Sequence, residues 1–401
     1  MAPSPLATPS SRALGRRNQL GVHTLIHTPC TELSTVIKLS IVLRVHLMHF
    51  GFMYKIFTTQ ELTRLGFTHT DLRFARDCCL LRLSRGVYLV RHVCSVDSHR
   101  VLWSSIDEGT HDEFVAHGDQ RDTIEALNAA VMAHCKVRFQ QGQRHIAVPS
   151  TGDARGNAAS PEDAEIITHI SAALVHGLPV AYPVTHQVEV VRPGVNRRFP
   201  NLHVRGATIP KQHIQTTPYG LQVTTLERTL VDVARTYSLE ISVAMLDDAL
   251  RRKLTTPATI RTVFAQSFEK RNSKRVELAL DLADARRESP AESVAAVRFY
   301  QHGIVGMTPQ VSFTTDTFGT TIRVDFCHQA ANLIVEVDGI GKLYLGSGVP
   351  RDELERERRR EQWLRDRGWR IVRISWKELF QEAKFEEIKR AVMGATTASA
   401  R

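Results

Sequence analysis

Three carboxylates lie close together between Thr321 and Lys342, and acids grouped in this way can hold a metal ion. Apolar and polar residues alternate along both halves of this stretch, which is typical of two half-buried β-strands. We expect a hairpin whose loop spans His328–Ala331. Because strand side chains alternate between two faces, the hairpin gathers its acids on one face: Asp325, Glu336 and Asp338.

The predicted register of this hairpin follows from the loop. Phe326 pairs with Leu333 and Val324 pairs with Val335, so apolar side chains meet. Together with Ile322, the apolar residues of the first strand are expected to share one face. The acid of the first strand then lies diagonal to the first acid of the second strand.

Gathered carboxylates repel one another and need a compensating cation. Hard oxygen ligands suit Mg²⁺ or Mn²⁺, and Lys342 could stabilise a developing negative charge. Acids and a lysine beside a metal are what phosphodiester hydrolysis needs. An ordinary hairpin with a solvated outer face explains the same pattern, and spacing alone leaves both interpretations open.

Several ordered features of the C-terminal third resemble the restriction-endonuclease-like PD-(D/E)XK superfamily. They are Asp325, the run Glu336-Val337-Asp338-Gly339, Lys342, an Arg/Glu-rich helix over Arg351–Arg367, and Gly368–Arg373. The nearest branch is the one related to very-short-patch-repair (Vsr) endonucleases, and the resemblance covers Ser289 to Ala391. It implies an α/β core with a mixed sheet, a divalent metal and cleavage of DNA.

The same resemblance implies roles for individual residues. Asp325 matches the first metal-binding acid and Glu336 the second. Asp338 stands where the superfamily pattern has a lysine, and Lys342 is the candidate to replace that lysine. Glu292 matches an acid on the first helix of the family, but as the N3 residue of a helix capped by Ser289 it fits a capping box equally well.

The Arg/Glu-rich helix is mostly explained by a solvated surface with pairs of opposite charge four residues apart. Arg360 is the exception, because its place in the family pattern makes it a candidate contact to DNA phosphate.

A second informative block, from Thr58 to Arg91, is predicted to contain two short helices and a β-hairpin. Threonines can cap both helices, and Ser84-Arg85-Gly86 has the chemistry of a turn. The order is that of a winged helix, in which the second helix lies in the major groove and the hairpin reaches phosphates. The candidate DNA-binding residues are Thr70, Arg73, Arg76, Arg82 and Arg85.

This block resembles the N-terminal domain of AbiEi-type antitoxins, the repressors of some abortive-infection toxin–antitoxin pairs. The resemblance rests on helix, Leu-Gly, helix, and a basic turn into Arg85–Tyr88. Two middle segments, Ser171–Pro179 and Thr225–Asp232, resemble the same proteins. A small winged helix used for protein contact is the alternative. Arg228 and Asp232, four residues apart, are expected to form a structural pair.

The composition of the 401 residues, 42% hydrophobic and 23% charged, is that of an ordinary globular protein with room for two or three domains. A net charge of +10 favours a polyanionic partner such as nucleic acid. The six cysteines form no C-x-x-C and show no zinc-finger spacing with histidines, which fits a reducing cytoplasm. The stretch Val36–Tyr54 is too interrupted by charge for a membrane span.

The predicted fold is multidomain α/β. Residues 1–52 are expected to be a disordered or mis-annotated extension, 53–92 a winged helix-turn-helix, and 93–163 a poorly defined connecting region. Residues 164–270 are expected to form an AbiEi-like middle α/β domain, and 285–395 an endonuclease-like α/β domain with a mixed sheet.

Two functions remain open from the sequence. One is a DNA-binding, metal-dependent endonuclease, and the other is a non-enzymatic AbiEi-type antitoxin or transcriptional regulator with a degenerate nuclease domain. The expected partners are double-stranded DNA and, from the resemblance, a cognate toxin.

Overall fold

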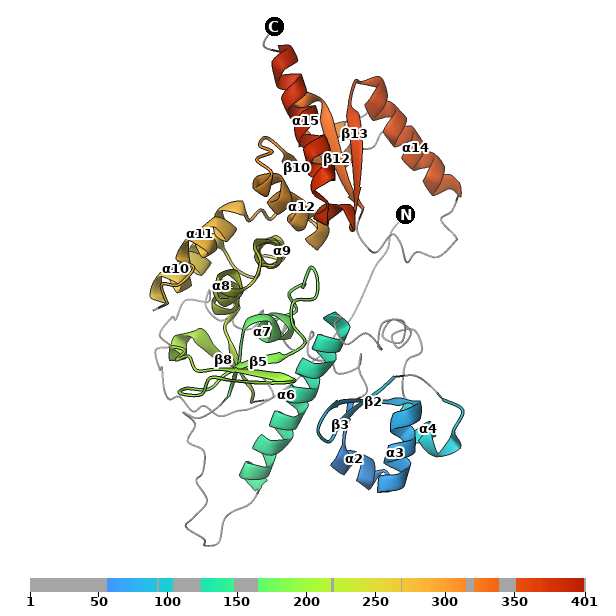
Figure 1. Ribbon diagram of the computed structural model, residues 1–401, viewed down its shortest axis with the longest axis vertical. Helices are drawn as coiled ribbons and strands as arrows, with labels where there is room; N and C mark the ends of the chain where they lie inside the picture. Colours follow the sequence, from blue (N-terminus) through green and yellow to red (C-terminus); the bar gives the residue numbers. More distant parts are fainter. Residues whose placement is uncertain are drawn as a thin grey trace, which may run out of the picture.

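The computed structural model describes residues 56–91, 94–103, 124–147, 165–217, 220–267, 269–314, 321–338 and 351–399. The chain is a multidomain α/β protein with three sheets, two of them mixed, within these ranges. Figure 1 shows an N-terminal group of elements in blue, a middle group in green and yellow, and a C-terminal group in orange and red. The expectations for residues 1–52, for the stretch Val36–Tyr54 and for Lys342 lie outside the described residues.

The N-terminal unit has the helices and hairpin where the sequence predicts them. Its antiparallel sheet has the order β1-β3-β2. Thr58 and Thr68 cap the two helices, each in a capping box with an acid three residues later. The elements are β1 (Ile56–Thr58), α2 (Thr59–Arg64), α3 (His69–Cys78), β2 (Leu80–Ser84), β3 (Val87–Val90), η1 (Asp97–His99) and α4 (Arg100–Trp103).

Helix α6 (Ile124–Ala147) packs against both the N-terminal unit and the middle domain. Ala129 and Ala133 join the cluster that covers the N-terminal sheet. Leu127, Val131 and Cys135 join the main core, which includes the middle sheet. At 3.6 residues per turn these two sets lie on opposite faces of the helix, so α6 is apolar on two sides.

Polar contacts hold α6 at the start of the middle domain. The carboxylate of Glu165 accepts hydrogen bonds from Arg138 (Nε 3.0 Å, Nη2 2.9 Å) and from Arg192 (Nε 2.8 Å), and it also contacts His134. Burial alone would raise the pKa of Glu165, but these three partners lower it to about 2. On the N-terminal side, Lys136 of α6 forms an ion pair with Glu61 at 3.0 Å.

The middle domain is a six-stranded mixed sheet with the order β6-β7-β5-β4-β9-β8. At the start of the domain a short strand is followed directly by a helix. The strands are β4 (Ile166–Ile167), β5 (Val188–Val191), β6 (Arg197–Phe199), β7 (Leu202–Arg205), β8 (Ile214–Thr216) and β9 (Gln222–Thr224). The helices are α7 (His169–Val175), α8 (Leu226–Thr236), α9 (Leu239–Arg251), α10 (Pro257–Gln266) and α11 (Ser273–Leu282), with η3 at Lys211–His213.

The C-terminal unit is a four-stranded mixed sheet with the order β10-β11-β12-β13, in which β12 and β13 are parallel. Phe299 of α12 and Phe385 of α15 pack on one face, where Phe326 lies. Trp363 and Leu364 of α14 pack on the other face, and Figure 1 shows α14 and α15 on either side of β13. The elements are α12 (Pro290–Gln301), β10 (Thr308–Thr314), β11 (Thr321–His328), η4 (Gln329–Ala331), β12 (Leu333–Asp338), α14 (Arg351–Asp366), β13 (Arg370–Ser375), η5 (Glu378–Phe380) and α15 (Glu382–Ser399).

The predicted register of the C-terminal hairpin was wrong by two residues. Phe326 pairs with Val335 and His328 pairs with Leu333. The reason is the loop, in which His328 still pairs and Asn332 turns the chain with φ of 46°. A shift of two residues preserves the faces, and continuing it places Asp325 directly opposite Glu336 rather than diagonal to it.

The predicted common face for Ile322, Val324 and Phe326 was also wrong. Ile322 and Val324 pack with α14, whereas Phe326 packs on the opposite face of the sheet. The pairing between β10 and β11 skips Gln310 and Asp325, and Gln310 has φ of 56°. This local distortion of the strand pair reverses the alternation of side chains at Asp325.

A buried acid joins the middle and C-terminal units. Asp247 of α9 accepts hydrogen bonds from the backbone N–H of Asp284 (2.6 Å), from Arg287 (2.5 Å) and from Ser293 of α12 (2.7 Å). Apolar residues of both units also belong to one continuous core. In the part of the chain that the structure describes, none of the helices is both long and apolar enough to cross a membrane.

We expect Glu165→Gln to weaken the attachment of α6. The substitution removes the buried negative charge that two arginines and His134 contact, so it should lower the free energy of unfolding by about 1–3 kcal/mol near neutral pH. Because the folded-state pKa of about 2 is below the ordinary glutamate value of 4.5, this stabilisation is present above pH 4.5 and is lost as the pH falls towards 2. Urea unfolding of variant and wild type at about pH 7 and about pH 3 measures it.

Asp281→Asn is the matched control, because Asp281 is exposed and pairs with Arg261 at 2.8 Å on the surface. Its effect should be within about 0.5 kcal/mol. Equal destabilisation by the two substitutions would contradict the role of Glu165.

Candidate functional site

The two acids that the sequence assigns to a metal face each other on neighbouring strands. Asp325 lies on β11 and Glu336 on β12, and both side chains are partly buried. Asp325 Oδ2 accepts a hydrogen bond of 2.8 Å from the backbone N–H of Val337. The charge of Asp325 is close enough to raise the pKa of Glu336. The predicted pair of acids is therefore brought together by the sheet.

Arg360 of α14 binds one of these acids directly. Its Nη2 donates to Glu336 Oε1 at 2.7 Å and to the backbone carbonyl of Arg323 at 2.9 Å. Its Nη1 donates to both carboxylate oxygens of Glu357, and Glu357 also accepts from Arg373 at 2.8 Å. The residue predicted to contact DNA phosphate is thus part of an ion-pair network over the two acids.

The pKa of Glu336 is raised to about 7. Burial is the largest cause, since it disfavours the charged carboxylate. Arg360 acts in the opposite direction and lowers the pKa, whereas Asp325 raises it. Such a shift in a group of facing acids is a common property of functional sites, although ion-pair networks also produce it.

Glu292 of α12 is connected to the acid pair through a residue of strand β10. It is buried in the first turn of α12, where its backbone N–H bonds the Ser289 side chain at 3.2 Å and its carboxylate accepts from Ser289 Oγ at 2.9 Å. Gln310 of β10 donates to the same carboxylate at 2.7 Å. Gln310 and Asp325 are the two residues that the pairing of β10 and β11 skips, between Pro309–Phe326 and Val311–Val324. Glu292 therefore caps its helix and bonds the strand residue beside the acid pair.

Asp338 is the last residue of β12, and it pairs in register with Ser375 of β13. Carboxylates of the kind found in this region are the oxygen donors that Mg²⁺ or Mn²⁺ prefers. A cation bound between Asp325 and Glu336 would have to compete with the guanidinium of Arg360 for Glu336.

The second helix of the N-terminal unit presents a basic surface. Leu72 and Ala75 of α3 are buried, so the opposite side of the helix faces outwards. All five residues predicted to bind DNA in this unit are exposed: Thr70, Arg73, Arg76, Arg82 and Arg85. Phe74, 61% exposed, lies on the same side of α3.

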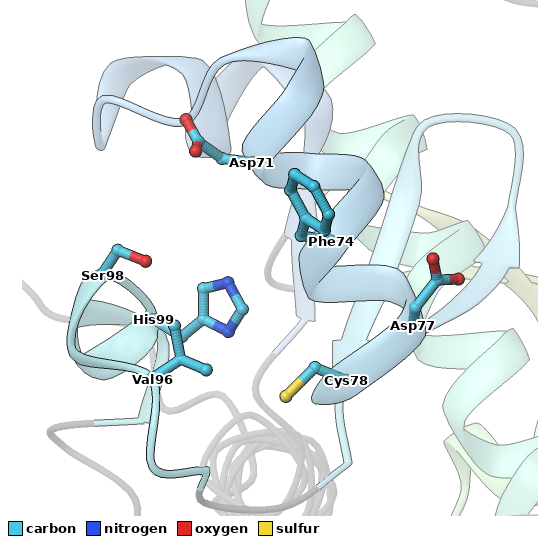
Figure 2. A pocket seen from close by; sticks show the side chains of 7 residues that line it. All are labelled: Asp71, Phe74, Asp77, Cys78, Val96, Ser98 and His99. Carbon is cyan, nitrogen blue, oxygen red and sulfur yellow. The ribbon is translucent and has the colours of Figure 1, made fainter.

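A pocket of about 440 Å³ lies beside α3. Figure 2 shows Asp71, Phe74 and Asp77 along the helix and Val96 and His99 on the segment opposite. Cys78 lines the pocket at the end of the helix.

Next to this pocket, the structure brings together four side chains that the sequence does not connect. The thiols of Cys78, Cys79 and Cys94 and the ring of His99 place one ligand atom each within 4.8 Å of all the others. The group has neither a C-x-x-C nor zinc-finger spacing in the sequence. Their spacing in the sequence does not reveal the group, because two members come from the end of α3 and two from the segment after β3. Burial raises the pKa of the Cys78 and Cys79 thiols.

The middle domain contains buried polar groups around Glu189 of β5. Its carboxylate accepts from Arg205 at 2.6 Å and from the backbone N–H of Ile170 at 3.1 Å. Arg228 and Asp232, predicted as a structural pair, are both buried, with Arg228 Nε 2.9 Å from each carboxylate oxygen. Each of these two acids therefore has an arginine partner, while the buried Nε of Arg205 has no hydrogen-bond partner.

Comparison with known proteins identifies the middle domain. Residues 165–282 match the family model described as the AbiEi antitoxin C-terminal domain, a range that includes β4 to α11. Two uncharacterized proteins of Mycobacterium tuberculosis, from strains CDC 1551 / Oshkosh and ATCC 25618 / H37Rv, are each 30% identical over 147 residues. The aligned region is 36% of this chain and 52% of each relative, so the chain spans about half the length of the curated relatives it matches. The family match leaves the predicted endonuclease-like domain, residues 285–395, outside it.

We expect substitutions of the two neighbours of Glu336 to move its pKa in opposite directions. Asp325→Asn removes a negative charge and should lower the pKa from about 7, while Arg360→Gln removes a positive charge and should raise it, each by roughly one unit. Carbon-13 NMR titration of the glutamate carboxyl groups measures both. Because the folded-state pKa exceeds 4.5, the stabilisation linked to Glu336 is complete below about pH 4.5 and is lost as pH rises through 7.

Glu387→Gln is the control, since Glu387 pairs with Arg370 at 3.1 Å on the surface. It should leave the titration of Glu336 unchanged. Shifts of the same sign in the two test variants would show that neither charge acts on Glu336 as the geometry implies.

Proposed function

We propose that this protein is a DNA-binding regulator of the AbiEi antitoxin type, in which the N-terminal unit contacts duplex DNA. The observation that carries the proposal is the exposed basic side of α3, on a chain whose residues 165–282 match an AbiEi antitoxin domain. The order of two helices followed by a hairpin is that of a winged helix, with α3 as the recognition helix.

The charges of the N-terminal unit favour a polyanion. Seven arginines against four acids between Ile56 and Trp103 leave a net charge of three positive units. Arg73 and Arg76 are three residues apart on α3 and so project from neighbouring positions on one side. Arg82 and Arg85 belong to the hairpin of β2 and β3 and its turn, where contact with phosphate would fix the orientation of the unit.

The hairpin turn is held against the start of α2. The backbone N–H of Thr59 donates to the carbonyl of Gly86 at 2.8 Å, and Gly86 adopts φ of 75°. A left-handed residue at this turn suits glycine, because a β-carbon would be strained there. The basic hairpin and the helical pair therefore form one rigid surface for DNA.

The partner implied by the family is a cognate toxin protein. The middle domain is the part of the chain that carries this likeness, so it is the region that we assign to toxin contact. Copurification of a toxin encoded beside this gene with the full chain, and its loss when residues 165–282 are replaced, would support the assignment.

The ion-pair network at Glu336 supports a non-enzymatic C-terminal domain. Arg360 supplies the positive charge that a metal would otherwise bring, and Glu357 and Arg373 extend the network. The acid pair is then a structural element that fixes α14 over the sheet.

A metal-dependent endonuclease is the second candidate function, because Asp325 and Glu336 face each other on adjacent strands. In that case Asp325 and Glu336 would hold Mg²⁺ or Mn²⁺ once Arg360 had moved away, and Glu292 would be linked to them through Gln310. The metal would supply an activated water for attack on phosphorus. Arg360 would be released to contact DNA phosphate.

We expect Arg73→Ala and Arg76→Ala to weaken DNA binding. Each substitution removes one phosphate-facing cation, so Kd for a mixed-sequence duplex should rise by about fivefold and the salt slope of log K should fall by about one. Fluorescence anisotropy across a range of salt concentrations measures both quantities.

The control is Arg261→Ala, which removes an equal charge from an exposed position of α10 in the middle domain. It should leave Kd and the salt slope unchanged. If the control weakens binding as much as the α3 variants do, the effect is one of net charge and α3 is not the DNA-binding surface.

We expect no metal-dependent nicking of supercoiled DNA by the wild-type protein. The test compares wild type and Asp325→Ala with Mg²⁺, with Mn²⁺ and with EDTA, using agarose gels of plasmid DNA. Nicking that requires the metal and disappears in Asp325→Ala would refute the regulator and establish the nuclease. Equal nicking by both proteins would identify a contaminating activity and leave the regulator standing.

A further inference from the structure

The four-residue cluster at the end of α3 joins two segments of the N-terminal unit. Cys78 is the last residue of α3, and Cys79 is its C-cap. Cys94 and His99 belong to the segment that follows β3, with His99 at the end of η1. Cys79 and His99 are buried, while Cys78 and Cys94 are half-buried.

Two distances within the cluster match those of a tetrahedral metal site. Cys79 Sγ and Cys94 Sγ each lie 3.5 Å from His99 Nδ1. Zinc binds sulfur at about 2.3 Å and nitrogen at about 2.0–2.1 Å, so two ligands of a tetrahedron are separated by about 3.5 Å for S and N and about 3.8 Å for S and S. All ligand atoms of the cluster lie within 4.8 Å of one another, which leaves them a small adjustment from this geometry.

We propose that Cys78, Cys79, Cys94 and His99 form a structural zinc site. Three thiolates and an imidazole are soft and borderline donors that select Zn²⁺ over Mg²⁺ or Ca²⁺. Four protein ligands complete the tetrahedron, so the site is of the closed, structural kind without a position for substrate.

The surroundings of the cluster favour a fixed geometry. Phe67 stacks on the ring of His99, with centroids 6.1 Å apart and planes at 25°. Cys79 is also held by its backbone, because its carbonyl accepts a hydrogen bond of 2.7 Å from the N–H of Arg91. Leu102, three residues after His99, is buried in the core of the N-terminal unit. Ligands that are already oriented lose little freedom when the metal binds.

Bound zinc would link the segment from Cys94 to Trp103 to the C-terminal end of α3. This link would fix the position of the helix that carries Arg73 and Arg76. The proposal does not depend on DNA binding, since metal content is measured on the protein alone.

The experiment is metal analysis of the full chain, produced with zinc in the medium and purified without a histidine tag or a chelator. Inductively coupled plasma mass spectrometry should find about one zinc per chain. Replacement by Co²⁺ should give the visible bands of a tetrahedral site and the near-ultraviolet bands of thiolate-to-metal charge transfer. Zinc should be lost in Cys79→Ser and in Cys94→Ser.

The control is Cys327→Ser, which removes a buried cysteine of β11 far from the cluster in sequence. It should retain the zinc of the wild type. The wild-type measurement stands even if a cluster variant fails to fold.

Two results would overturn the proposal. One is wild-type protein with zinc far below one per chain, together with cobalt spectra that lack thiolate bands. The other is a disulfide between Cys94 and Cys78 or Cys79, found by peptide mass analysis of protein kept under reducing conditions.

Discussion

The arrangement of this protein depends on α6 packing against two sheets at once. Ala129 and Ala133 allow close approach to the N-terminal sheet, while Leu127 and Val131 enter the core of the middle domain. The side chain of Lys136 and the network at Glu165 fix the helix at both contacts. Asn201 of the middle domain also donates to the carbonyl of Leu83 in β2, at 3.2 Å. A basic unit and an antitoxin-like domain are thus joined by packing as well as by chain connectivity.

This joint gives the proposed function a physical basis. A regulator that responds to a partner protein needs the partner-binding domain to influence the DNA-binding surface, and coupling passes through packed elements with more than one arrangement. In this chain α6 contacts the sheet against which α3 packs. It also contacts α7 and β5 of the middle domain, and its Arg138 binds Glu165, the residue before β4. Helix α6 is therefore the element through which a conformational change in the middle domain would reach the N-terminal unit.

The sequence predicts much of the local structure and less of the contacts. Capping threonines at Thr58 and Thr68 locate the helices of the N-terminal unit, because their chemistry is local. The role of α6 could not be predicted, since apolar stripes on opposite faces do not produce the one-sided pattern that identifies a packed helix. The prediction of the C-terminal hairpin register was wrong because His328 extends the strand and Asn332 makes the turn. The cysteine cluster was missed because its members come from two segments that only the fold brings together.

The C-terminal domain illustrates why a motif does not decide a function. The pattern of acids predicts a facing pair, and Asp325 and Glu336 do face each other across two strands. The pattern of acids does not include Arg360, the side chain that binds Glu336. Arg360 lies 24 residues after Glu336, on α14. The packing of Trp363 and Leu364 holds that helix over the sheet. A guanidinium bound to a half-buried carboxylate and a divalent cation bound to the same oxygens are alternative ways to balance the same charge. In this structure the cation that Glu336 binds is the guanidinium of Arg360.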